Sequence, residues 1–320
     1  MKINKVEQLS IELAGGCNLA CPMCPQADGR EKDFLGALPF EVFTKAVDEA
    51  LPLGLKFVNL GGSGEPMLYK KINEVVSYLT ERNLESLIYT NGTYLTPEKF
   101  EKLCQSGLTT CKVSCQGYNR ESYHKWMSKD QYDFIRANLK KCVDILKNNP
   151  NYTTELQTNH LIHDYDELEY QKNLYIENWI DYLGVTGEIW MTHNWSGQFE
   201  SIPRHEIFES RERRSCGRPL TNVIEVRAGG IGKQKGAVVP CPNVLGQDSK
   251  AVMGHLEEIS LIEAFNSSLL DSKEEELSLF LKYLSVKTSI KSSIHSDFNL
   301  AKSTFGFSKN EVKTEKLCIS

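Results

Sequence analysis

The chain has 320 residues, of which 40% are hydrophobic and 25% are charged, and its formal net charge is −5. This composition excludes wholesale disorder, and the length suffices for one large α/β domain with a small appendage or for two medium domains. The mildly acidic balance gives no electrostatic footprint for nucleic acid or an anionic membrane. No apolar run approaches the roughly 20 residues that span a bilayer, and the N-terminus lacks a signal-peptide core. We therefore expect a cytoplasmic protein with neither nucleic-acid nor membrane partners.

Short apolar runs alternate with longer amphipathic ones in the first part of the chain. The predicted strands are Leu9–Ala14, Lys56–Leu60, Ser86–Thr90, Thr109–Cys115, Glu155–Ile162 and Glu188–Thr192. The predicted helices are Pro39–Leu51, Lys70–Arg82, Pro97–Gln105, Gln131–Lys147 and Tyr165–Leu183. Thr96 before Pro97 is a helix start signal, and Gly54, Gly107 and Gly184 mark helix ends. The alternation predicts βαβ units with a parallel sheet, and its length fits a partial (β/α)6 TIM-like barrel better than a full one of roughly 250 residues.

The pattern changes after this predicted barrel core, which we assign to residues 1–200. Two short β-like runs, Asn222–Arg227 and Gly236–Val239, flank a glycine pair and predict a hairpin. We expect residues 201–272 to form a small C-terminal extension that contains it. Residues 273–320 are polar and rich in Lys and Ser, with one amphipathic run at Glu274–Leu284, so we expect a partly disordered tail.

Three cysteines follow the first predicted strand directly, in a C-x3-C-x2-C pattern formed by Cys17, Cys21 and Cys24. Thiolates are the usual protein ligands of iron–sulfur clusters, and three on one loop can bind three irons of a [4Fe–4S] cube. The fourth iron would then be open to a small molecule. Zinc is one alternative, but a structural zinc site needs four ligands and no fourth Cys or His lies nearby. Free thiols are the other alternative.

This loop resembles the signature of the radical S-adenosylmethionine (SAM) enzymes, which place it after the first strand of a partial TIM barrel. The resemblance covers about residues 6–195. It implies a [4Fe–4S] cluster bound by Cys17, Cys21 and Cys24, with SAM on the open iron. It also implies an external one-electron donor such as flavodoxin or ferredoxin. Reductive cleavage of SAM would yield a 5′-deoxyadenosyl radical that abstracts a substrate hydrogen.

Three further strand ends match family motifs for SAM binding. The second strand ends in Gly61-Gly62-Ser63-Gly64-Glu65-Pro66, a variant of the family's Gly-Gly-Glu-Pro motif whose backbone contacts the SAM amino group. Glycines allow this close approach of main chain to ligand. The third strand ends at Asn91, in a Thr-Asn-Gly sequence common in the family. The fourth carries Ser114, which the resemblance places near the SAM ribose or carboxylate, with Gln116 where Asp is common.

Other residues have two open interpretations. The run His193–Gly197 after the sixth strand fits a substrate-pocket lining or a capped loop. His124 and Trp126 fit helix packing better than a pocket. We expect Cys104, Cys111 and Cys142 to be buried as small hydrophobes, and Cys115 too unless it points to the substrate from its strand end.

A second cysteine set, Cys216 and Cys241, brackets the predicted hairpin and resembles the SPASM/twitch extension. That extension binds one or two auxiliary Fe–S clusters and usually adds a later C-x2-C, which this chain lacks. The only later cysteine is Cys318. An auxiliary cluster would be incompletely ligated, would use Cys318 with a non-cysteine ligand, or would be lost through an altered C-terminus.

These features predict a radical SAM oxidoreductase of dehydrogenase type. The resemblance offers two substrate classes: an alcohol on a carbohydrate or aminocyclitol, and a side chain of a ribosomal peptide or protein. Only 16 residues precede Cys17, too few for the leader-recognition domain of many peptide modifiers, which favours the small molecule. A degenerate, non-catalytic Fe–S protein is the alternative of another class. The sequence identifies no general base.

Overall fold

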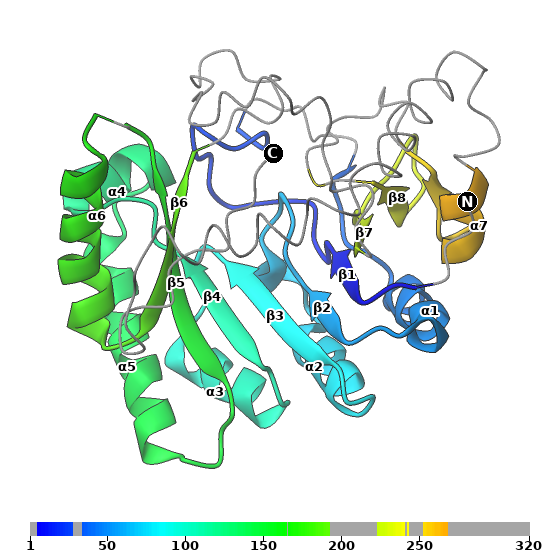
Figure 1. The fold of residues 1–320 in the computed structure, drawn as a ribbon, viewed down its shortest axis with the longest axis horizontal. Coiled ribbons are helices and arrows are strands. Elements are labelled where there is room, and N and C mark those ends of the chain that lie inside the picture. Colours follow the sequence, from blue (N-terminus) through cyan, green and yellow to red (C-terminus); the bar gives the residue numbers. More distant parts are fainter. Residues whose placement is uncertain are drawn as a thin grey trace, which may run out of the picture.

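The computed structural model describes residues 5–27, 34–164, 166–192, 223–240, 242 and 252–267. Within these ranges nine strands form one sheet, in the order β6-β5-β4-β3-β2-β1-β7-β8-β9 (Figure 1). Strands β1 to β6 are mutually parallel, as expected for consecutive βαβ units. The bounds are β1 Gln8–Ile11, β2 Phe57–Asn59, β3 Glu85–Thr90, β4 Thr110–Ser114, β5 Glu155–Ile162, β6 Thr186–Met191, β7 Val223–Val226, β8 Ala237–Val239 and β9 Gly254–His255.

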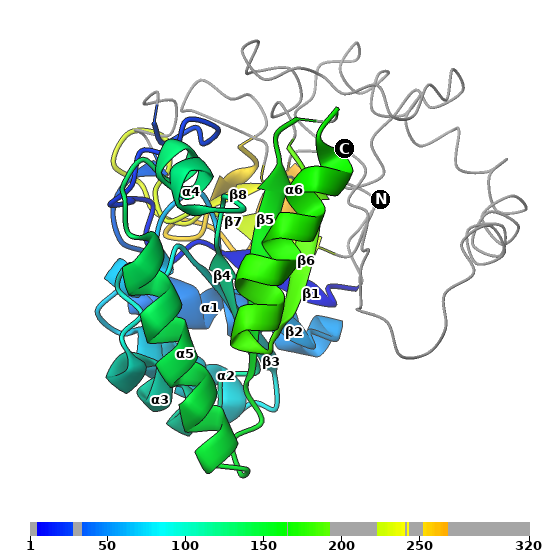
Figure 2. The same cartoon turned by 90° about the vertical axis from the view of Figure 1, so that its left-hand side faces the viewer.

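The helices that connect these strands lie along the outer side of the curved sheet, from α1 beside β1 to α6 beside β6 (Figures 1 and 2). This arrangement leaves the other, inner face of the sheet to side chains and loops. The helices are α1 Phe40–Ala50, α2 Ile72–Thr80, α3 Pro97–Gln105, α4 Arg120–Met127, α5 Tyr132–Asn148, α6 Leu168–Tyr175 and α7 Leu261–Ser267.

The helix boundaries follow local capping chemistry. The Thr96 side chain accepts a hydrogen bond from the Lys99 amide at 3.3 Å and so caps α3, with Pro97 in its first turn. Gly54, Gly107 and Gly184 have φ values of +91°, +88° and +70°. The predicted start and end signals are therefore confirmed.

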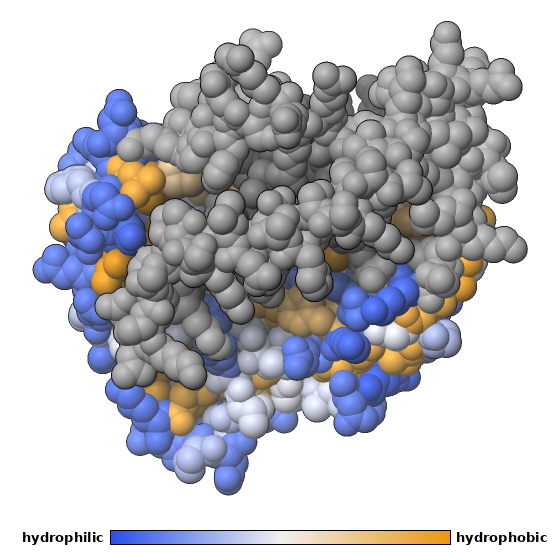
Figure 3. Space-filling model, in the orientation of Figure 1, coloured by the Kyte–Doolittle hydropathy of each residue, from blue (hydrophilic) through white to orange (hydrophobic). Residues whose placement is uncertain are grey.

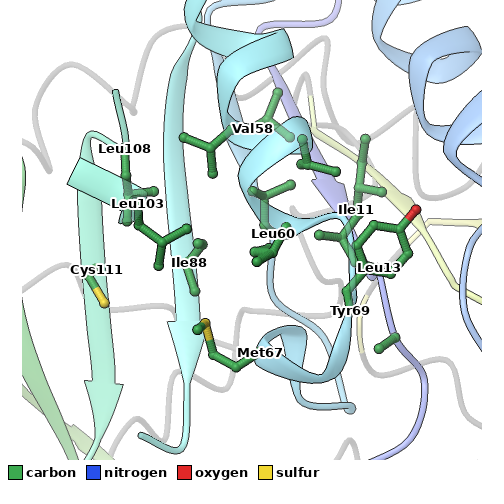
Figure 4. Packing of buried hydrophobic residues seen from close by; sticks show 14 of the residues in the cluster. Ile11, Leu13, Val58, Leu60, Met67, Tyr69, Ile88, Leu103, Leu108 and Cys111 are labelled. Carbon is green, nitrogen blue, oxygen red and sulfur yellow. The ribbon is translucent and has the colours of Figure 1, made fainter. Parts of the chain in front are cut away.

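The main core lies between the sheet and its outer helices. Leu9 and Ile11 of β1, Val58 of β2 and Ile88 of β3 are fully buried. Figure 4 shows Ile11, Val58 and Ile88 packed with Leu103 of α3 and neighbouring apolar side chains. Side chains alternate between the two faces of a strand, so the residues between these apolar ones point to the inner face.

Two elements differ from the sequence prediction. Helix α4 was not expected as a separate helix, although Asn119 caps it by accepting from the Ser122 amide at 2.9 Å. The last predicted barrel helix is not continuous α-helix: α6 passes into the π-helical segment Ile176–Asp181. Trp179 in that segment is fully buried and donates its indole N–H to the Gly117 carbonyl at 2.9 Å. This tertiary contact fixes the turn, so helical periodicity alone does not reveal it.

The first strand is also shorter than predicted. The sheet pairing of β1 ends at Ile11, while Leu13 and Gly15 bond to another segment of the chain. The Leu38 amide donates to the Leu13 carbonyl at 2.9 Å, and the Gly15 amide donates to the Gly36 carbonyl at 2.8 Å. The backbone that leads to the cysteine loop is thus held by residues 36–38.

The predicted hairpin is present as β7 and β8, which pair antiparallel. Strand β7 also pairs in parallel with β1, which places it next to the first barrel strand despite the long separation in sequence. The hairpin is therefore part of the same sheet as the barrel strands. The candidate pocket run His193–Gly197, the cysteines Cys216, Cys241 and Cys318, and the tail 273–320 lie outside the described residues.

Among the described residues, no helix combines the length and the apolar character required to cross a membrane. On the face seen in Figure 3, hydrophilic residues alternate with scattered apolar ones over the helices. Scattered apolar residues are normal for a protein surface in water.

Candidate functional site

The three clustered cysteines lie on the loop that leaves the C-terminal end of β1. The Cys24 amide donates to the Cys21 carbonyl at 2.9 Å, which closes a turn between the second and third cysteines. The Cys17 sulfur receives the Asn91 side-chain N–H at 3.6 Å, and the backbone N–H groups of Asn18 and Leu19 also point to it. Hydrogen bonds of this kind stabilise a thiolate and tune an iron–sulfur cluster.

The cysteine environment fits a positively charged metal group. Burial raises the pKa of Cys17, and burial together with the nearby Cys24 and Cys17 raises the pKa of Cys21 to about 12. Three neighbouring thiolates repel one another, and a bound cation would offset that repulsion. Among the described residues, no three His, Cys, Asp or Glu side chains converge on a single ion position. A cubane does not need such convergence, because each thiolate binds a different iron.

The glycine loop after β2, residues Gly61–Glu65, is packed directly against the cysteine loop, which carries Cys17, Cys21 and Cys24. The Glu65 amide donates to the Gly16 carbonyl at 2.8 Å. A Cβ on Gly64 would overlap the Ala14 carbonyl oxygen, and a Cβ on Gly62 would overlap the Glu12 carboxylate. Only glycine allows these approaches, so two of the predicted SAM-motif glycines are required by the contact between the two loops.

Glu65 lies beneath this loop and is only 1% exposed. Its carboxylate accepts from the Thr90 hydroxyl at 2.6 Å, the Asn91 amide at 2.7 Å and the Met67 amide at 2.9 Å. Burial raises the pKa of Glu65, while the hydrogen bonds from Thr90, Asn91 and Met67 oppose that rise. The side chain thus joins the ends of β2 and β3, and a ligand would meet the backbone of its loop.

The end of β3 forms a hydrogen-bonded bridge to the cysteine loop. Besides its bond to Cys17, the Asn91 amide donates to Asn18 Oδ1 at 3.0 Å. Asn18 in turn donates to Thr93 Oγ1 at 2.8 Å, and Thr93 donates its hydroxyl to Asn91 Oδ1 at 2.6 Å. Asn91, a predicted site residue, therefore lies at the cysteines, together with Asn18 and Thr93, which the sequence did not single out.

Ser114 is at the end of β4 on the inner face, where its hydroxyl lies within hydrogen-bonding reach of the Tyr89 phenol. Burial raises the pKa of Tyr89, and the negative charge of Glu188 adds to the rise. Gln116 is buried and held on both sides: it donates to Asn159 at 3.2 Å and accepts from the Leu161 amide at 2.6 Å. Gln116 thus stabilises the β4–β5 strand ends.

A buried ion pair next to the glycine loop was not predicted. Arg227, which follows β7, pairs with Glu12, which follows β1, at 3.3 Å, and both side chains are 1% exposed. The Ser63 amide donates to the same Glu12 carboxylate at 2.7 Å. The sequence signal is a charged residue inside an apolar run, at Ile11-Glu12-Leu13 and at Val226-Arg227-Ala228, but neither run reveals its partner.

A second ion pair lies on the inner face of the sheet and spans from β4 to β6. Lys112 of β4 pairs with Glu188 of β6 at 2.8 Å, and their side chains are 10% and 26% exposed. The Trp190 indole donates to Glu188 at 2.9 Å, and the Lys112 ammonium lies 5.8 Å from the Tyr89 ring centre. Tyr89 is two residues before Asn91, the residue that contacts Cys17, so it lies on the strand that leads to the cysteine loop. The sequence did not single out Lys112 or Glu188.

The remaining described cysteines are away from the site. Cys104, Cys111, Cys115 and Cys142 are all buried, which confirms the expectation of small core hydrophobes. Burial raises the pKa of Cys115 well above its usual value, and its neighbours include Tyr123 and Tyr175 of the helical layer. Cys115 belongs to the apolar core cluster, as expected for a small buried hydrophobe. Trp126 stacks on His163 at 3.5 Å, in agreement with a packing role.

Comparison with known proteins identifies the class. The profile of the radical SAM superfamily matches residues 11–174. The chain belongs to this superfamily, whose members use a [4Fe–4S] cluster and SAM. The matched region begins in β1 and includes the cysteine loop, the glycine loop and the ends of β3 and β4. It does not reach the segment where the twitch-like extension is expected, which stays a prediction.

Individual relatives cover only part of the chain. The AdoMet-dependent heme synthase of Methanosarcina barkeri is 34% identical over 120 residues, 38% of this chain and 34% of that protein. The mycofactocin maturase MftC of Mycolicibacterium smegmatis is 32% identical over 134 residues, 40% of this chain and 32% of that protein. The chain thus spans about a third of the length of these curated relatives.

Solved structures share the fold over more of the chain. BtrN in complex with AdoMet and 2-DOIA has a TM-score of 0.53 at 18% identity, covering 87% of this chain and 86% of that one. Streptococcus suis SuiB bound to S-adenosylmethionine has a TM-score of 0.61 at 16% identity, covering 82% of this chain and 66% of that one. At these identities the likeness concerns the fold, a partial TIM-like barrel.

Proposed function

We propose that Cys17, Cys21 and Cys24 bind the [4Fe–4S] cluster and that the Gly61–Glu65 loop binds SAM beside it. The observation that carries this assignment is the contact set around the cysteines: Asn91 donates to the Cys17 sulfur, and the Glu65 amide bonds to Gly16. These contacts bring together three motifs that are separate in sequence. When bound and reduced, the cluster supplies the electron that cleaves SAM to a 5′-deoxyadenosyl radical, which abstracts a substrate hydrogen.

The chain's own groups then have distinct tasks. The N–H groups around Cys17 stabilise its thiolate. Asn91 donates to the same sulfur and so holds the cysteine loop at the end of β3. Glu65 holds the strand ends so that the backbone of the glycine loop stays open to a ligand. Ser114, beside Tyr89, provides a hydroxyl at the end of β4 for the ribose or carboxylate of SAM.

We propose further that the substrate is a polar small molecule of the carbohydrate or aminocyclitol type, which the enzyme oxidises. The inner face supports this, because Lys112, Glu188 and Tyr89 offer hydrogen-bonding groups there, two of them with opposite charges. Such groups can bind the hydroxyls and amine of this substrate class. The similarity in fold to BtrN, whose structure contains 2-DOIA, agrees with the proposal.

Modification of a peptide is the second candidate. Its support is the sequence similarity to the maturase MftC and the similarity in fold to SuiB, which was also solved with a precursor peptide. The two candidates differ in the source of the abstracted hydrogen. Deuterium transfer into 5′-deoxyadenosine from a deuterated aminocyclitol would favour the first, and transfer from a deuterated peptide would favour the second.

The first experiment measures iron and sulfide after anaerobic reconstitution, together with 5′-deoxyadenosine formed from SAM under a chemical reductant. We expect about four irons per chain in the wild type and none in the variant Cys17→Ala/Cys21→Ala/Cys24→Ala. The matched control is Cys104→Ala/Cys111→Ala/Cys142→Ala, which removes three buried cysteines away from the site and should keep its iron.

The outcomes separate the remaining alternatives. Iron that survives in the first variant would assign an auxiliary cluster to Cys216 and Cys241. A wild-type protein with a cluster but no 5′-deoxyadenosine would be the non-catalytic Fe–S protein. A wild-type protein without iron would contradict the assignment of Cys17, Cys21 and Cys24.

A further inference from the structure

Three distant segments meet at the Glu12 carboxylate. Glu12 follows β1, Ser63 is in the glycine loop 51 residues later, and Arg227 is a further 164 residues along the chain. One carboxylate oxygen accepts from the Ser63 amide at 2.7 Å and pairs with Arg227 Nη2 at 3.3 Å. The other accepts from the Ala228 amide at 3.3 Å and from Arg227 Nε at 3.4 Å.

Arg227 also contacts the glycine loop itself. Its Nη2 donates to the Ser63 hydroxyl at 3.0 Å, so one guanidinium nitrogen touches both Glu12 and the loop. The guanidinium lies 4.7 Å from the Phe34 ring centre, and Nη1 lies 3.5 Å from the Pro242 carbonyl oxygen. The planar, multi-donor shape of arginine suits a bridge between several fixed acceptors, which a lysine ammonium does not reproduce.

We infer that Arg227 is a positioning residue for SAM, which it serves by holding Glu12 and Ser63 so that the glycine loop keeps its ligand-binding shape. The inference rests on the proposed function, because it takes the Gly61–Glu65 loop as the SAM site. It makes the β7–β8 hairpin part of that site although the hairpin lies outside the region matched by the family profile.

The glycine loop lies directly against the Glu12–Arg227 ion pair. A Cβ on Gly62 would overlap the Glu12 carboxylate, so the loop backbone wraps closely around that group. Burying two charges costs desolvation energy, and an apolar pair of the same volume is often as stable. An apolar pair could not accept hydrogen bonds, whereas the Glu12 carboxylate accepts from the Ser63 and Ala228 amides. These bonds fix the backbone direction at both residues.

The experiment compares SAM binding in anaerobically reconstituted wild type, Arg227→Met, Arg227→Lys and Glu12→Gln by equilibrium dialysis with labelled SAM. Iron content is measured in parallel on the same samples. We expect Arg227→Met to weaken SAM binding by roughly 10- to 100-fold, the effect typical of losing a residue that orients a site, with iron unchanged. Arg227→Lys keeps the positive charge but lacks the planar, multi-donor guanidinium, and it should weaken SAM binding less than Arg227→Met does. The matched control is Arg82→Met, which removes an arginine from the exposed Asp48 pair and should bind SAM normally.

A second readout does not need SAM or the cluster. Amide hydrogen exchange of the peptide that contains Ser63 should be faster in Arg227→Met than in wild type, while exchange in α3 should be unchanged. If Arg227→Met does not fold, Arg227→Lys provides the same comparison. The inference would be overturned if the folded variants kept the wild-type iron content and the wild-type affinity for SAM. Failure of the proposed function looks different, because the wild type itself would then hold no cluster or bind no SAM.

Discussion

Two ion pairs lie on the inner face of the sheet, and both join strands that are far apart in sequence. Glu12 and Arg227 are 1% exposed, and backbone amides of Ser63 and Ala228 complete the carboxylate's hydrogen bonds. Lys112 and Glu188 are 10% and 26% exposed, and Glu188 contacts the side chains of Lys112 and Trp190. The first pair holds a loop through backbone amides, whereas Glu188 of the second pair is bonded by side chains and is partly exposed.

The largest expected effect comes from breaking the buried pair. Glu12→Gln removes the carboxylate charge that faces the buried Arg227 guanidinium and turns an amide N–H toward donors. We expect a loss of about 3 to 5 kcal/mol in the free energy of unfolding, measured by anaerobic chemical denaturation. A loss comparable to that of Glu188→Gln would remove the distinction between the two pairs.

A smaller effect is expected at Glu65, which is buried like Glu12 but contacts no cationic side chain in the part of the chain that the structure describes. Its carboxylate accepts from Thr90, Asn91 and Met67, and Glu65→Gln would present an N–H to one of these donors. We expect the free energy of unfolding to fall by about 2 kcal/mol, the cost of an unsatisfied buried polar group. Glu98→Gln on exposed α3 is the control, and equal losses in both variants would contradict the role given to Glu65.

Acid should destabilise the protein through buried His160, behind the sheet. Burial lowers the pKa of His160 to about 3, with a smaller contribution from His163. The unfolded chain binds a proton near pH 6.5 and the folded chain does not, so stability is present above about pH 6.5 and falls as the pH drops toward 3.

Between pH 7 and pH 5 this histidine should cost roughly 1 to 2 kcal/mol of unfolding free energy. His160→Asn provides a non-titrating acceptor for the Gly117 amide, which donates to His160 at 3.2 Å. Chemical denaturation at both pH values should therefore show a smaller pH dependence in the variant. An unchanged pH dependence would mean that other groups account for the acid sensitivity.

The smallest change in stability is expected for the Lys112–Glu188 pair. Lys112→Met/Glu188→Leu replaces a partly exposed ion pair by apolar side chains of similar size, and the free energy of unfolding should change by no more than about 1 kcal/mol. SAM affinity should stay unchanged. Binding of an aminocyclitol probe, followed by saturation-transfer NMR with the amine-free cyclitol as control, should be lost. Retained probe binding would remove Lys112 and Glu188 from the proposed substrate site.

Local patterns in the sequence predicted most of the barrel. The six strands were found because apolar runs of strand length alternate with amphipathic ones, and the helix limits at Thr96, Gly54 and Gly107 follow from capping and left-handed backbone chemistry. The cysteine spacing predicted the site loop for the same reason, since its ligands are a few residues apart. The separation of α4 and the π-helical turn at Trp179 depend on tertiary contacts and were missed.

The sequence by itself determined the class of chemistry, because the C-x3-C-x2-C loop and the glycine loop are contiguous motifs. Only the tertiary structure decided what supports them. The pairing of β7 with β1 brings Arg227 to Glu12, and the curvature of the sheet brings Lys112 of β4 to Glu188 of β6. A single charged residue in an apolar strand shows that a partner must exist, because an unpaired buried charge is costly. Which residue is that partner depends on strand order, and no local pattern encodes it.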